Sequence, residues 1–98
     1  MNLISEWFGR WKTNRMTGRG VFLLRVGHYE KALALLLKVI ERDPESHMAW
    51  TDKGLTLAKQ GKYKPALKAY ETALRLKPPE KEREQLVGLI KSAKGKLT

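Results

Sequence analysis

The chain has 98 residues, a formal net charge of +10 and no cysteine, with 42% hydrophobic and 31% charged residues. This size fits one domain with a modest core, and the composition is too apolar for a disordered chain. Disulfides and thiolate metal sites are excluded, and the longest apolar run, residues 32–37, is too short to span a bilayer. The amino end lacks the continuous apolar stretch of a secretory signal. We therefore expect a cytoplasmic protein with a basic surface.

Residues 1–12 are an amphipathic segment rich in tryptophan. Trp7 and Trp11 are four residues apart with Phe8 beside them, and basic residues follow closely. This spacing predicts an apolar helical stripe, which Gly9 interrupts. Three interpretations stay open: a capping helix folded onto the domain, an interfacial membrane helix, and a docking or dimerisation element.

An internal repeat follows this segment. When residues 13–46 are placed on residues 47–80, an offset of thirty-four, eight positions are identical. The identical pairs are Thr17/Thr51, Gly20/Gly54, Leu23/Leu57, Gly27/Gly61, Tyr29/Tyr63, Ala32/Ala66, Leu33/Leu67 and Pro44/Pro78. A fixed period of this length indicates a repeat architecture.

Each unit is predicted to contain two helices separated by a glycine. Apolar residues recur at helical spacing on both sides of Gly27 and of Gly61, and a glycine at such a point is the usual left-handed cap of a helix. Pro65 suits the first turn of the following helix. Pro44 and Pro78 prevent continuation at the end of each unit.

Small and aromatic residues of the second unit have a packing role in this scheme. Gly54 and Ala66 let two helices approach closely, and Trp50 and Tyr70 fill the flanking space. We interpret these residues as core.

The last segment, residues 81–98, is predicted to be a capping helix. Acidic residues near its start and lysines near its end complement the helix dipole. Its apolar residues form one narrow stripe: Leu86, Leu89, Ile90 and Ala93. Such a helix would cover the open face of the second unit.

Patterns of catalytic and metal-binding residues are missing from the sequence. His28 and His47 each lie next to a predicted helix boundary, and neither has a second ligand one turn away. The stretch RMTGRG lacks the pattern of a phosphate-binding loop, and no serine or threonine stands in a nucleophile motif. We expect no enzyme, no metal site and no cofactor.

The repeat unit resembles the tetratricopeptide repeat, which has the same period. In the second unit the signature positions are held by Trp50, Gly54, Leu57, Gly61, Tyr63, Ala66, Tyr70, Ala73 and Pro78. In the first unit they are held by Gly20, Leu23, Gly27, Tyr29, Ala32, Leu36, Val39 and Pro44. The departures are Lys53 and Arg19 in place of a leucine, and Met16 in place of a tryptophan.

This resemblance implies an all-α fold, a right-handed superhelix of antiparallel helix pairs. It also implies a scaffold or adaptor that binds a peptide segment of a partner protein in a concave groove, which the first helix of each pair lines. The residues that correspond to the groove are Asn14, Thr17, Val21, Leu24, Arg25, Thr51, Leu55, Lys59 and Leu89.

The partner expected from these residues carries apolar and acidic groups, because the groove is apolar at its centre and has Arg25 and Lys59 at its margin. Some family members clamp an acidic chain terminus, but the clamp positions here are Thr17, Val21, Asp52, Gln85 and Leu89, which lack the required lysine and asparagine. The alternative docking residues are Trp7, Phe8 and Trp11. A basic nucleic-acid-binding or membrane-surface module is the alternative function, since the isoelectric point is near 10.1. We expect a monomer or a weak homodimer.

Overall fold

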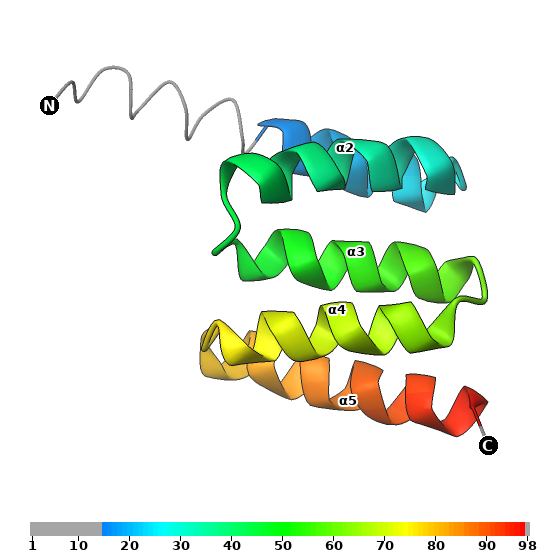
Figure 1. Ribbon diagram of the computed structural model, residues 1–98, viewed down its shortest axis with the longest axis vertical. Coiled ribbons are helices and arrows are strands. Elements are labelled where there is room, and N and C mark those ends of the chain that lie inside the picture. Colours follow the sequence, from blue (N-terminus) through cyan, green and yellow to red (C-terminus); the bar gives the residue numbers. More distant parts are fainter. Residues whose placement is uncertain (1–14, 98) are drawn as a thin grey trace, which may run out of the picture.

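The computed structural model describes residues 15–97, and these residues form helices and short turns with no strand. Residues 15–25 are helical, and four helices follow: α2 (Tyr29–Arg42), α3 (His47–Lys59), α4 (Tyr63–Arg75) and α5 (Glu80–Lys96). Neighbours in sequence pack on each other, α2 on α3, α3 on α4 and α4 on α5. Figure 1 shows these helices side by side with alternating direction. The predicted all-α fold of antiparallel helix pairs is confirmed for this part of the chain.

The predicted glycine caps reverse the chain in the same way in both units. Gly61, with a φ of 78°, follows α3 in the left-handed conformation. The Lys62 amide donates to the Leu57 carbonyl at 2.9 Å, and the Gly61 amide donates to the Ala58 carbonyl at 3.0 Å. The first unit has the matching bonds, from His28 to Leu23 at 2.8 Å and from Gly27 (φ 86°) to Leu24 at 3.1 Å. These bonds satisfy carbonyls that the helix end leaves free.

The connection into α3 is fixed by side-chain hydrogen bonds. Ser46 is the N-cap, and its Oγ accepts from the Ala49 amide at 3.3 Å. The Trp50 indole Nε1 donates to the Pro44 carbonyl at 2.8 Å, which holds the turn against the helix. The signature tryptophan of the second unit therefore anchors the junction between the two units.

The buried residues repeat with the same thirty-four-residue offset. In the first unit they include Gly20, Ala32, Leu36 and Val39, and in the second they include Gly54, Ala66, Tyr70 and Ala73. A Cβ on Gly54 would overlap the Tyr70 ring and lie 3.2 Å from the Ala66 carbonyl oxygen. The prediction that small residues permit close helix approach is thus confirmed.

Helix α5 closes the far side of α4. Its Leu86 and Ala93 are 1% and 4% exposed, and Leu89 and Ile90 pack partly buried against the same core. Gly88 stands thirty-four residues after Gly54, but a Cβ there would meet nothing within 4 Å. The predicted role of this segment as a capping helix is consistent with its packing.

Candidate functional site

The helix over residues 15–25, α3 and α5 each present one face to a pair of surface hollows. On α3, Met48, Leu55 and Lys59 are seven and eleven residues apart, so they lie within about 40° around the helix axis. Leu55 and Lys59 line the hollow between α3 and α5, and Met48 lines the hollow between α3 and the helix over residues 15–25. One face of α3 therefore serves both hollows.

The hollow between α3 and α5 has a volume of about 380 Å³. Leu55, Ala58, Tyr63 and Leu89, which form much of its lining, pack partly buried against the hydrophobic core. Its full lining is Leu55, Ala58, Lys59, Tyr63, Tyr70, Leu89, Ser92, Ala93 and Lys96. We call this site the α3–α5 hollow.

Two lysines give the α3–α5 hollow a charged end. Lys59 lies in the last turn of α3 and Lys96 in the last turn of α5, and both side chains are exposed. Both helices end on the same side of the stack (Figure 1). The hollow thus combines apolar side chains with two ammonium groups toward one end, which suits a ligand with an apolar group and a nearby carboxylate.

The second hollow, about 600 Å³ in volume, lies between the helix over residues 15–25 and the start of α3. Its lining residues are Thr17, Gly18, Val21, Phe22, Arg25, Ser46 and Met48. Phe22 and Met48 are 62% and 58% exposed, so this hollow presents two large apolar side chains to solvent. We call this site the amino-terminal hollow.

A family model described as tetratricopeptide repeat matches residues 19–81, which is more than half of the chain. The chain belongs to the tetratricopeptide repeat family. The match agrees with the helix pairs and repeated core described above, and repeats of this family generally mediate protein–protein interaction.

Most residues predicted to line the groove of the tetratricopeptide repeats fall into the two hollows. Thr17, Val21 and Arg25 line the amino-terminal hollow, and Leu55, Lys59 and Leu89 line the α3–α5 hollow.

Two predicted groove residues line neither hollow. Leu24 is partly buried, and it lies about 60° around the helix from Val21. The Thr51 hydroxyl donates to the His47 carbonyl at 2.8 Å within its own helix. Asn14 and the alternative docking residues Trp7, Phe8 and Trp11 lie outside the described residues.

Sequence reasoning missed several residues that line the hollows of these repeats. Tyr63 and Tyr70 belong to α4, the second helix of its pair, so the expectation that first helices alone line the groove overlooked them. Lys96 lies seven residues after Leu89, which places both on one face of α5. That spacing was the available signal for Lys96.

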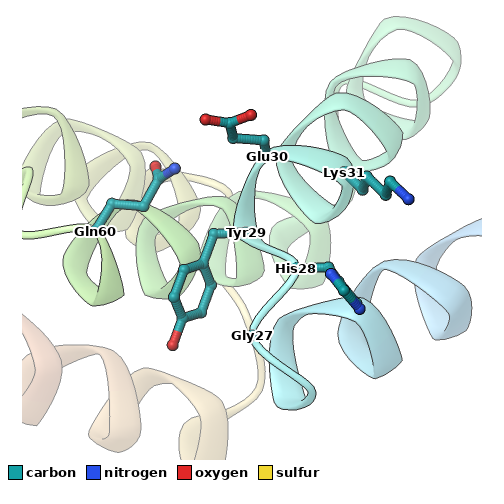
Figure 2. Close-up of a pocket in the computed structure, with 6 residues that line it drawn as sticks. All are labelled: Gly27, His28, Tyr29, Glu30, Lys31 and Gln60. Atoms are coloured by element: carbon teal, nitrogen blue, oxygen red, sulfur yellow. The ribbon is translucent and has the colours of Figure 1, made fainter.

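A third hollow of about 340 Å³ lies at the start of α2 and does not form a convergent site. Figure 2 shows Gln60 on one side of the α2 start, while His28 and Lys31 point away from it on the other side. The Gln60 Oε1 atom is buried without a hydrogen-bond partner among the described residues. These side chains do not point toward one common space, as the side chains of a binding or catalytic site must.

The clearest electrostatic perturbation of the second repeat lies away from the hollows. Burial raises the pKa of the Asp52 carboxyl from 3.8 to about 6. The residue lies on α3 but lines neither hollow. Its neighbour Lys53, which replaces a signature leucine, places its Nζ 4.9 Å from the centre of the Trp50 ring.

In residues 15–97 no group of three or more histidine and acidic side chains is placed to hold a metal ion. Within the same residues, no helix has the length and hydropathy needed to cross a bilayer.

Proposed function

We propose that the chain is a non-enzymatic adaptor whose tetratricopeptide repeats bind a peptide segment of a partner protein along the face formed by the two hollows. The observation that carries this proposal is the α3–α5 hollow, where apolar side chains of α3 and α5 adjoin Lys59 and Lys96. An apolar side chain of the partner packs between Leu55 and Leu89, and a carboxylate lies near the two lysines.

The α3 face sets the spacing between the apolar and the acidic residue of the bound peptide. Leu55 precedes Lys59 by one helical turn, so the apolar contact and the charged contact are about 6 Å apart along the axis. Adjacent residues of an extended peptide advance by about 3.3 Å, so the apolar and acidic residues of the partner are separated by about two positions. The amino-terminal hollow, with Phe22 and Met48 exposed, takes a second apolar residue of the same segment.

The experiment is a screen of an immobilised peptide library with the purified full-length chain. The library contains peptides with apolar and acidic residues, peptides in which lysine replaces each acidic residue, and scrambled versions. We expect retention on the acidic set. Leu55→Glu weakens retention by at least about thirty-fold, because it places an unpaired charge in the centre of the contact.

Two further variants separate binding from folding. Lys59→Glu combined with Lys96→Glu changes exposed side chains and reverses the preference from acidic to lysine-substituted peptides. Lys68→Glu combined with Lys91→Glu, exposed on α4 and α5 and outside both hollows, makes the same change in total charge and leaves the preference unchanged. An unchanged preference in the double variant, with helical circular dichroism retained, would show that another surface holds the peptide.

The cytoplasmic location stays a prediction, as does the division into residues 1–12, 13–46, 47–80 and 81–98. Binding of nucleic acid also stays a prediction, for which a mobility-shift assay across a salt series is the measurement.

A further inference from the structure

One end of the helix stack gathers basic side chains from three separate stretches of the chain. Residues 25–31, 59–64 and 93–97 belong to the turn before α2, the turn between α3 and α4, and the end of α5, and Figure 1 shows all three on the right. Their basic residues are Arg25, Lys31, Lys59, Lys62, Lys64, Lys94 and Lys96, and their one acidic residue is Glu30. We call this surface the lysine-rich end; its net charge of +6 is more than half of the total of +10.

The described residues at the opposite end of the stack carry no net charge. Residues 15–17, 41–47 and 75–84 lie there (Figure 1) and carry six basic and six acidic side chains. Charge is therefore polarised along the helix axes. An anionic surface attracts the lysine-rich end and orients the molecule, an effect that acts over about 8–10 Å at physiological salt.

The side chains at the lysine-rich end suit a delocalised negative surface. All seven basic residues are exposed, and six of the seven are lysines. Lysine is a flexible point charge without the fixed fork with which arginine recognises a single carboxylate or phosphate. Attraction to a layer of anionic headgroups needs only such point charges and no directional pairing.

Exposed apolar side chains accompany the charge. Val26 is 50% exposed in the turn before α2, and Leu97 is 44% exposed after the end of α5. Phe22, one turn before Val26, is 62% exposed. Apolar side chains beside lysines enter the headgroup region of a bilayer, whereas the phosphates of a nucleic acid offer them no apolar partner.

We propose that the lysine-rich end docks on the surface of a membrane containing anionic phospholipids, with the helix axes directed toward the bilayer. Single-stranded nucleic acid is the less suitable occupant, because the aromatic residues in these stretches, Tyr29 and Tyr63, are partly buried and not free to stack on bases. The lysine-rich end shares Arg25, Lys59 and Lys96 with the hollows, but the docking needs no bound peptide, and Lys62 and Lys64 line neither hollow.

The test is co-sedimentation of the full-length chain with vesicles of phosphatidylserine in phosphatidylcholine, compared with phosphatidylcholine alone. We expect binding to the anionic vesicles only, and loss of binding as salt rises. Lys62→Glu combined with Lys64→Glu lowers the partition coefficient by at least about thirty-fold, since each basic residue near the surface contributes roughly five-fold. Neither residue lines the α3–α5 hollow.

The matched control is Lys81→Glu combined with Arg83→Glu. It makes the same change in total charge, but at the neutral end. Both double variants also place glutamates around the first turn of a helix, α4 or α5, where the helix dipole favours negative charge. This control retains binding within about three-fold of the original chain. An equal loss of vesicle binding in both double variants would mean that only total charge matters. No loss in either variant would assign the docking to residues 1–12. Either result overturns the proposal. So would a chain that shifts a DNA duplex but binds no vesicle.

Discussion

Substituting alanine at corresponding positions of the two repeat units and of α5 tests the helix packing with internal controls. Gly20, Gly54 and Gly88 are separated by thirty-four residues each, and all three are in helices. A Cβ at Gly54 would overlap the Tyr70 ring, one at Gly20 would lie 3.1 Å from the Leu36 side chain, and one at Gly88 would have open space. The same substitution is therefore made at three positions that differ in how closely the neighbouring atoms lie.

The magnitudes follow from two opposing effects. Alanine favours a helix over glycine by about 0.5–1 kcal/mol at any of these positions. Overpacking costs about 1–3 kcal/mol where rigid neighbours must move, as the buried Tyr70 ring and the Ala66 backbone must. We expect Gly88→Ala to raise the free energy of unfolding by about 0.5–1 kcal/mol and Gly54→Ala to lower it by about 1–2 kcal/mol. Gly20→Ala falls between them, because the added Cβ would lie 3.1 Å and 3.2 Å from two Leu36 side-chain atoms, a tight contact but not the overlap found at Gly54.

The assay is urea unfolding followed by far-ultraviolet circular dichroism, with the slope of the transition checked for a change in mechanism. For a domain of this size, 1 kcal/mol corresponds to about 4–8 °C in the melting temperature, so the order of the three variants is resolvable. If Gly54→Ala stabilises the chain as much as Gly88→Ala does, then α3 and α4 do not approach as closely as described here.

Three other substitutions probe the junction between the repeats. Asp52→Asn raises the free energy of unfolding at pH 7 by about 1–3 kcal/mol. The folded chain holds the Asp52 proton more tightly than the unfolded chain does. The free energy of unfolding of the original chain therefore falls as pH rises from about 4 to above 6. If Asp52→Asn has the same pH profile as the original chain, Asp52 is not the cause of this fall. Ser46→Ala removes the acceptor for the Ala49 amide and costs about 1 kcal/mol in thermal unfolding, and no loss would mean that water replaces the cap. Trp50→Phe removes the bond to the Pro44 carbonyl and costs about 1 kcal/mol, whereas an unchanged melting temperature would argue against an anchoring role.

The local structure was largely predictable because local residues determine it. Gly27 and Gly61 adopt positive φ where the glycine pattern placed helix ends. The buried set, such as Ala66 and Tyr70, follows from helical spacing and from the repeated offset. These features depend on neighbours a few residues away or on one helix packing against the next.

The charge distribution was not predictable in the same way. Along the sequence the basic residues are spread out without a dense run, and they come together only because antiparallel helices bring residues 25–31, 59–64 and 93–97 to one end. The raised pKa of Asp52 likewise depends on its burial in the folded chain. For Lys96 the sequence offered only its seven-residue spacing from Leu89, and that α5 brings this face beside α3 depends on the packing.

The most direct measurement of peptide binding on the face formed by the two hollows is a map of amide chemical shifts. The isotope-labelled full-length chain is titrated with an acidic peptide retained in the library screen. We predict that the largest changes occur on one face of α3 and α5, at Leu55, Lys59 and Leu89, with weaker changes at Val21. Changes confined to the exposed side of α2 and α4, or to residues 1–12, would contradict the account.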